Sequence, residues 1–225
     1  MTEKPTIQTL KPFCRDVEDN FIAMHLKRLS DRYFEWFSIE EIGNHIRVLA
    51  SLSIENPVYV QAKKAKDERI CCTVLSFNYV SLFAVITGTL ASAGFNIHDG
   101  NIFTYSVSKS TAKKNQKLLS RSELEKSRYS PDVILERRKV VDCFNGDIND
   151  PDNLESWLEL IQSHLSDAVA LLEDGKIEKS RQLVHEWVIQ NLSTSNYPSE
   201  PMLYPMQMDF DNSHPAMTLL KVKSE

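Results

Sequence analysis

The clearest indication of the fold lies in residues 70–105, which read ICCTVLSFNYVSLFAVITGTLASAGFNIHDGNIFTY. The first part, within 69–77, is short, apolar and rich in β-branched residues, which predicts a buried strand. From Ser81 to Gly94 the apolar residues follow helical spacing, and a glycine is a common residue just past the end of a helix. The remaining residues return to a strand pattern. The stretch therefore predicts a strand–helix–strand unit.

The residues beyond this unit predict further elements. RKVVDCFNGDI (138–148) predicts a strand, and DPDNLESWLELIQSHL (150–165) predicts a helix that starts at an Asp/Asn cap. An extra helix is expected at about 176–192. MQMDFD (206–211) is strand-like and can complete the βαββαβ order of a ferredoxin-like sandwich. A last strand-like run, 216–225, then has no strand left to pair with among the predicted elements.

The N-terminal part predicts helices instead. Ser38 followed by Glu41 is a capping box, in which each side chain satisfies a free backbone N–H of the other residue. The helix that follows carries an apolar stripe, and Pro57 closes this helical part. The stripe consists of Ile39, Ile42, Ile46 and Leu49. The predicted fold class is thus α+β, with a helical segment ahead of the sandwich.

Composition limits the class of protein. The chain has 225 residues, 42% of them hydrophobic and 25% charged, which suits one or two globular domains. The N-terminus lacks the apolar run of a signal peptide, and the longest mainly apolar run, 79–95, is too short and interrupted to span a bilayer. The cysteines (Cys14, Cys71, Cys72, Cys143) lack C-x-x-C spacing and are interpreted as reduced, mostly buried thiols. We therefore expect a cytoplasmic protein without a membrane partner.

A basic insertion is expected at about 106–137. From Ser106 to Lys139, ten lysines and arginines stand against four acidic residues, a balance of +6 that leaves −11 for the rest of a chain with net charge −5. The insertion has little apolar content and is interpreted as a surface loop. Tyr129 is its only aromatic residue available for stacking on a base, which disfavours nucleic-acid binding.

The pair His98-Asp99 stands where the second strand begins, and it allows three interpretations. A metal or hydrolase site needs further ligands, and no other histidine has ligand spacing. The pair can instead be structural and order the start of the strand. It can also be regulatory, beside a ligand site at the N-terminus of the helix that starts near Ser81, where free N–H groups favour a carboxylate.

These residues resemble a known family. The 70–105 stretch with KVVDCFNGDI resembles an ACT domain, a small ferredoxin-like module that binds amino acids and regulates enzymes. More narrowly, it resembles the first ACT domain of the bifunctional PII uridylyltransferase/uridylyl-removing enzymes. The family pattern Asn-Ile/Val-x-Asp-Ala-x-Ile-x-Thr stands here as NIHDGNIFT (96–104), and 28–49 and 208–225 resemble the flanking segments. The resemblance covers most of 26–105, 138–165 and 205–225.

Three departures from the family pattern matter. The Asp-x-x-Gly turn of ACT domains stands here as Asn78-Tyr79-Val80-Ser81, which removes the carboxylate and the glycine. The insertion is unusually long. Neither a nucleotidyltransferase motif nor a complete hydrolase set of His and Asp residues is present, so we expect no catalytic site and no cofactor in this chain. Mg²⁺ or Mn²⁺ is expected only in catalytic domains outside it.

The resemblance implies a regulatory part of a uridylyltransferase-like nucleotidyltransferase of nitrogen metabolism. It implies a helical connector at 1–56, an ACT-like domain at 57–212, and the first strand of a second ACT domain at 213–225. The expected ligand is an amino acid such as glutamine, and the expected partners are another ACT domain and the parent's catalytic domains. The expected ligand residues are Asn78, Tyr79, Val80, Ser81, Asn96 and Ile97, with His98 and Asp99 structural or regulatory. The alternative is an ACT-type interaction module that binds no ligand.

Overall fold

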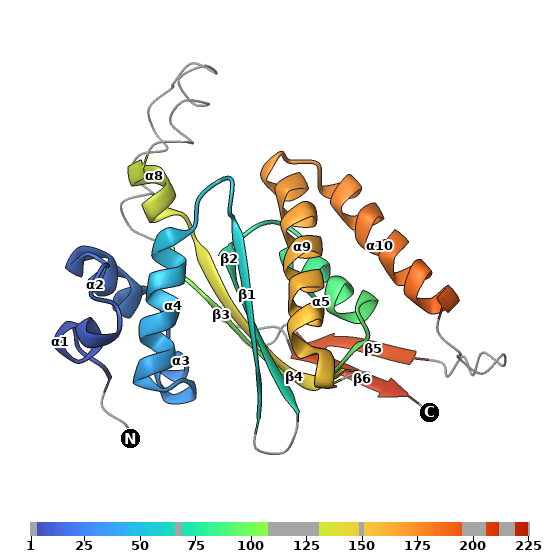
Figure 1. Ribbon diagram of the computed structural model, residues 1–225, viewed down its shortest axis with the longest axis horizontal. Coiled ribbons are helices and arrows are strands. Elements are labelled where there is room, and N and C mark those ends of the chain that lie inside the picture. Colours follow the sequence, from blue (N-terminus) through green and yellow to red (C-terminus); the bar gives the residue numbers. More distant parts are fainter. Residues whose placement is uncertain are drawn as a thin grey trace. The chain divides into compact units, whose positions relative to one another are not determined.

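The computed structural model describes residues 4–65, 69–107, 131–148, 151–194, 206–211 and 219–224. Through its contacts the chain divides into two compact units, Met1–Leu192 and Ser193–Glu225. The first holds a four-stranded sheet with helices on both faces, and the second holds a two-stranded sheet (Figure 1). The chain is therefore of the α+β class, as the sequence predicts.

The four-stranded sheet has the order β1-β2-β4-β3, and all neighbouring strands are antiparallel. Since β2 and β3 both pair with β4, they run parallel to each other, and α5 (Leu82–Ser92) forms the crossover between them. Gly94, with φ 73°, ends this crossover helix in the left-handed conformation that glycine favours. The predicted strand–helix–strand unit is confirmed. The strands are β1 (Val58–Lys64), β2 (Ile70–Phe77), β3 (Phe95–Thr104) and β4 (Lys139–Ile148).

Strand β1 corrects the predicted order of elements. We expected the run at 206–211 to complete this sheet, but β1 takes the edge beside β2. That run forms β5 (Met206–Asp211), which pairs with β6 (Leu219–Ser224) in the second sheet. A short loop joins β1 to β2, so their pairing closes at little cost in chain entropy. The alternation of Val58 and Val60, which are buried, with Tyr59, which is exposed, is the signal that predicts this strand.

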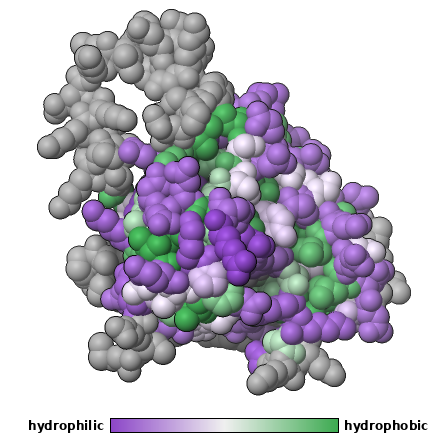
Figure 2. All heavy atoms as spheres, turned by 60° about the vertical axis from the view of Figure 1, so that its left-hand side comes forward, coloured by the Kyte–Doolittle hydropathy of each residue, from purple (hydrophilic) through white to green (hydrophobic). Residues whose placement is uncertain are grey.

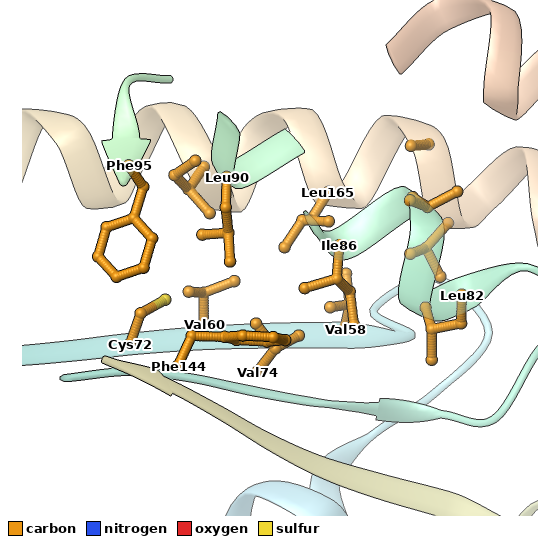
Figure 3. Packing of buried hydrophobic residues seen from close by; sticks show 14 of the residues in the cluster. Val58, Val60, Cys72, Val74, Leu82, Ile86, Leu90, Phe95, Phe144 and Leu165 are labelled. Atoms are coloured by element: carbon orange, nitrogen blue, oxygen red, sulfur yellow. The ribbon is translucent and has the colours of Figure 1, made fainter. Parts of the chain in front are cut away.

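One face of the sheet is covered by α5 and α9 (Leu154–Glu173) (Figure 1). Helix α9 follows a 3-10 turn, Pro151–Asn153, and Asn153 makes no side-chain capping bond, unlike the cap expected. The two helices and all four strands contribute to one apolar core (Figure 3). Its members include Val58, Val60, Cys72, Val74, Leu82, Ile86, Leu90, Phe95, Phe144 and Leu165.

The extra helix expected at about 176–192 is α10 (Ile177–Thr194). The Ser180 hydroxyl donates to the Ala168 carbonyl of α9 over 2.8 Å. Near the other end, the Asn191 side chain donates to the Ser92 carbonyl of α5 over 2.6 Å. These bonds hold α10 against both helices of that face.

The opposite face of the sheet is covered by the helices of the N-terminal segment (Figure 1). The segment we expect to be a connector thus packs directly on the sheet. The capping box of Ser38 and Glu41 is confirmed at the start of the last helix, whose Ile42, Ile46 and Leu49 are buried. Ile39, expected in the same stripe, is 44% exposed. The helices are α1 (Ile7–Leu10), a 3-10 turn (Lys11–Phe13), α2 (Asp19–Arg28), α3 (Asp31–Trp36) and α4 (Ile39–Ser51).

A short helix, α8 (Pro131–Glu136), lies at the end of the predicted insertion. Ile134 and Leu135 pack against the core of the helical face, and the Arg28 side chain donates to the Glu136 carbonyl over 2.9 Å. The expectation that the whole of 106–137 is a surface loop is therefore wrong for its last residues. Residues 108–130, which hold most of the basic charge, lie outside the described part of the chain.

The surface of the helical layer is mixed in character. Figure 2, turned to bring that side forward, shows hydrophilic side chains that separate smaller apolar patches. The exposed large apolar residues of these helices are Phe13, Trp36 and Ile39. Across the described ranges, no helix combines the length and apolar character that a membrane crossing requires.

Candidate functional site

The six residues expected to bind a ligand do not lie together. Phe77, at the end of β2, pairs with Lys139 of β4, whereas Asn96 pairs with Asp147 of the same strand. These partners are eight residues apart, which is about 26 Å along a strand. The turn at 78–81 and the start of β3 therefore lie at opposite ends of the sheet. The expected proximity is wrong because α5 is a crossover that carries the chain back before β3 begins.

The turn at 78–81 ends in a residue with a left-handed backbone conformation. Ser81 has φ 66° and ψ 6°, in the left-handed region, at the place where the family pattern has glycine. It is the only residue other than glycine with positive φ in the described part of the chain. The Asn78 N–H already donates to the Arg138 carbonyl over 2.8 Å. Asn78 and Val80 are exposed, and Tyr79 is half-buried.

A partly buried ion pair links the turn to α9. Arg137 donates to both carboxylate oxygens of Glu173, over 3.2 and 2.7 Å, and the Tyr79 hydroxyl donates to one of them over 2.7 Å. The guanidinium also stacks on the Phe77 ring, 4.2 Å from its centroid. Burial, followed by the hydrogen bond to Glu173, raises the pKa of Tyr79, so the phenol stays protonated. Tyr79 therefore has a structural role, in which it joins the turn to Glu173 of α9.

His98 and Asp99 both make cross-strand contacts at the start of β3. His98 Nε2 lies 2.9 Å from Asp147 Oδ2, and Asp99 Oδ1 accepts from the Asn145 side chain over 2.7 Å. A bulge separates the register of Ile97 from that of Asp99. Within the described ranges, no group of three or more His, Cys, Asp or Glu residues could hold a metal ion. The contacts favour the structural interpretation, in which the pair fixes the register of an edge strand.

A cavity of about 280 Å³, lined mostly by residues with polar or charged side chains, lies between α4 and the strands β1 and β2. Residues with odd numbers on these two strands face α4, because Gln61 pairs with Thr73 and Lys63 with Cys71. The cavity combines a cation, two carboxylates, two amides, a hydroxyl and a thiol. Its lining residues are Glu40, Glu41, Asn44, Gln61, Ala62, Lys63, Cys71 and Thr73.

One pair of opposite charges lines this cavity. Lys63 Nζ forms an ion pair with Glu41 Oε1, and the other carboxylate oxygen of Glu41 accepts the Ser38 N–H over 2.8 Å. Burial acts to raise the pKa of Glu41, but the hydrogen bonds from Lys63 and Ser38 outweigh it and lower the pKa. The same bond raises the pKa of Lys63. Both groups are therefore charged at neutral pH, and Lys63 remains 62% exposed at its side chain.

A chain of hydrogen bonds holds the amides in place. The Asn44 amide donates to Gln61 Oε1 over 2.7 Å, and Gln61 Nε2 lies 3.2 Å from Nε2 of buried His45. Since Gln61 then donates, His45 accepts at Nε2 and carries its proton on Nδ1, 2.9 Å from the Tyr33 hydroxyl. Burial lowers the pKa of His45 to about 4, which keeps the ring neutral. The amides thus face the cavity in one fixed orientation.

Two local sequence patterns indicate parts of this cavity. The capping box predicts that Glu41 turns back toward the start of α4, and alternation in 58–64 places Gln61 and Lys63 on one face of β1. Neither pattern says that α4 crosses β1 at this point. A larger, more open hollow of about 430 Å³ is lined by residues such as Asp167, Ala170, Glu173 and Leu183. Its charged lining residues are all acidic, so it offers no ion pair to a zwitterion.

A scan against family models and searches of the curated proteins and of the solved structures found no match to this chain.

Proposed function

We propose that this chain is an amino-acid-sensing regulatory module, and that the amino acid binds in the cavity between α4, β1 and β2. The observation that carries the proposal is the juxtaposition of Lys63 and Glu41 at that cavity. An amino acid carries one positive and one negative group a few bonds apart. A site that presents charges of both signs, with hydrogen-bonding groups around them, matches this chemistry.

In the bound state Lys63 holds the α-carboxylate, and Glu41 holds the α-ammonium group. The ion pair of the free protein is thereby exchanged for two ion pairs with the ligand, so no charge is left unpaired. Asn44 and Thr73 are placed to bind a polar side chain, since an amide and a hydroxyl each donate and accept. Glutamine, which the family resemblance implies, suits these groups.

A ligand in this cavity can have a regulatory effect because the cavity lies between α4 and the sheet. Glu41 and Asn44 belong to α4, whereas Lys63 and Thr73 belong to the sheet. A ligand that bridges the two favours one position of the helical layer on the sheet. The resemblance to uridylyltransferase-like enzymes supports a role in which that position biases catalytic domains outside this chain. The left-handed Ser81 adds support, because it keeps the turn shape that glycine gives the family.

Thermal unfolding with glutamine and a panel of other amino acids tests the proposal. A ligand that binds only the folded protein raises the melting temperature by mass action. We expect an increase with the natural chain and none with Lys63→Gln. The matched control is Lys64→Gln, at the next residue of β1, which lies on the other face of the strand and should keep the increase. If no amino acid raises the melting temperature, the proposal is wrong.

A second variant separates this cavity from the turn at 78–81. Asn78→Asp restores the carboxylate of the family pattern, and a ligand held at the turn would bind it more tightly. A ligand held by Lys63 should bind Asn78→Asp with the same affinity as the natural chain. A gain with Asn78→Asp together with unchanged binding in Lys63→Gln would move the site to the turn.

The alternative function, a ligand-free interaction module, has its own supporting observation. Val80, Phe83 and Ile102 are 73%, 51% and 49% exposed around α5 and the edge strand β3. Large exposed apolar residues are common at protein–protein interfaces. Sedimentation at increasing protein concentration tests this function. Association that Phe83→Ser weakens, in a chain that binds no amino acid, would favour it over sensing.

A further inference from the structure

Two cysteine sulfurs lie in contact on the face of the sheet that meets α4. Cys71 of β2 and Cys143 of β4 are diagonal neighbours, because Thr73, two residues after Cys71, is the partner of Cys143. Their Sγ atoms are 3.2 Å apart. A disulfide has a length of about 2.05 Å, so each sulfur needs to move only about 0.6 Å to form one. The pair is thus placed for a bond between the two strands.

The two thiols differ in access. Cys71 lines the cavity between α4, β1 and β2, and its side chain is half-buried. Cys143 lies beneath it and is 1% exposed. A small oxidant that enters the cavity therefore reaches Cys71 first. Cys143 is in contact with the Cys71 sulfur and can react with it once it is oxidised.

The surroundings favour a thiolate at Cys71. The Cys71 and Cys143 sulfurs are in hydrogen-bond contact, and this contact lowers the pKa of Cys71. The nearby charge of Lys63 acts in the same direction, while burial and Glu41 oppose it. The same contact, together with burial, raises the pKa of Cys143. The thiolate, which is the reactive form, therefore belongs to the accessible member of the pair.

The other two cysteines lack these features. Cys72 is buried on the opposite face of β2, and burial raises its pKa. Cys14 is buried in the helical layer and donates to the Leu10 carbonyl over 3.3 Å. Burial raises its pKa as well. They serve as internal controls of the same residue type.

We propose that Cys71 and Cys143 form a peroxide-reactive site, with Cys71 as the attacking sulfur and Cys143 as the resolving one. The Cys71 thiolate attacks one oxygen of hydrogen peroxide and the O–O bond breaks. The leaving hydroxide takes a proton to become water, and Cys71 becomes a sulfenic acid. Cys143 then attacks the Cys71 sulfur, the S–O bond breaks, and the Cys143 proton leaves with hydroxide as a second water. Both thiols are oxidised to one disulfide while the peroxide is reduced.

The site does not depend on amino-acid binding, because it needs only access through the same cavity. The disulfide would join β2 to β4 without changing their pairing, and a dithiol reductant would reopen it. Lys63 contributes by favouring the thiolate, so Lys63→Gln should slow the reaction severalfold without abolishing it.

Treatment of the full chain with hydrogen peroxide tests the proposal. We expect peptide mapping under non-reducing conditions to find Cys71 linked to Cys143, and dithiothreitol to restore both thiols. Cys143→Ser should stop at a sulfenic acid on Cys71, which dimedone traps, and Cys71→Ser should give neither product. Cys14→Ser and Cys72→Ala should behave as the natural chain, with circular dichroism to verify that each variant is folded.

Two outcomes would overturn the proposal. One is a rate of thiol loss in Cys71→Ser equal to that of the natural chain. The other is oxidation that falls on Cys14 or Cys72 first. A glutamine titration of the reduced protein keeps the two proposals apart, because it tests the sensing function whatever the thiols do.

Discussion

A buried carboxylate, Asp142, should make a large contribution to the way the stability of this protein depends on pH. Asp142 lies in β4 between Val74 of β2 and Ile102 of β3, and it is 2% exposed. One of its oxygens, Oδ1, has no hydrogen-bond partner among the described residues. Burial raises its pKa to about 7, against about 3.9 in an unfolded chain.

The sign of the effect follows from proton binding. Between these two pKa values the folded state binds more protons than the unfolded state, so this group lowers stability as pH rises through that window. The penalty is absent well below pH 4 and complete above pH 7. With 1.36 kcal/mol for each pKa unit, it amounts to about 1.5 kcal/mol at pH 5 and about 4 kcal/mol at pH 8.

Asp142→Asn keeps the shape of the side chain and removes the ionisation. The stability of the variant relative to the natural chain should therefore increase by about 2.5 kcal/mol between pH 5 and pH 8. Urea unfolding followed by circular dichroism at several pH values measures this difference. The matched control is Asp31→Asn, which removes a carboxylate that is 82% exposed and should show no such increase.

Comparison of two proteins at each pH cancels the titration of all other groups. The informative quantity is how the difference in unfolding free energy between the two proteins changes with pH. The unpaired amide of the variant also destabilises the folded state, but by an amount that does not depend on pH. If the difference stays constant within about 0.5 kcal/mol from pH 5 to pH 8, the pKa of Asp142 is not raised in the folded protein.

Three further predictions concern the backbone and the helical layer. Gly146→Ala should destabilise the protein by more than about 2 kcal/mol in urea unfolding, because a Cβ there would lie 2.1 Å from the Asn96 carbonyl oxygen. Gly175→Ala, which meets no atom within 4 Å but has φ 73°, should cost only about 1 kcal/mol, and a larger loss there than at Gly146 would contradict the argument. Ser81→Gly should raise the stability by up to about 1 kcal/mol, because glycine adopts the left-handed conformation of this residue without steric strain. The measurement is the melting temperature, which should rise. A lower melting temperature would show that the serine side chain stabilises the turn. Burial lowers the pKa of His25 to about 3 and of His45 to about 4, so below pH 6.5 the unfolded state binds more protons and stability should fall toward pH 4. Asp142 opposes this loss, so the fall should be steepest in Asp142→Asn, and a flat profile in that variant would contradict the assignment.

Much of the local structure was predictable because its causes are local. The capping box at Ser38, the end of α5 at Gly94 and the strand at 70–77 each follow from a few neighbouring residues. The presence of α10 also followed from the spacing of its apolar residues. Such patterns depend on the geometry of one helix or one strand, and the chain carries that information within a short window.

The pairing of strands was not predictable in the same way. MQMDFD fits a strand in either sheet, and only the structure shows that β1 takes the edge beside β2 while β5 pairs with β6. The same limit explains the expected ligand site. Asn78 and Asn96 are close in the sequence, yet a crossover helix places them at opposite ends of the sheet.

The two candidate sites depend entirely on tertiary structure. Lys63 and Glu41 are far apart in the sequence and meet because α4 crosses β1, and Cys71 meets Cys143 because β2 pairs with β4. The polar and apolar faces of these elements can be read from the amino-acid order alone, since side-chain periodicity is a property of each element. Which faces meet was decided only when the sheet and both helical layers packed together, because that choice depends on the free energy of the whole core rather than of any one segment.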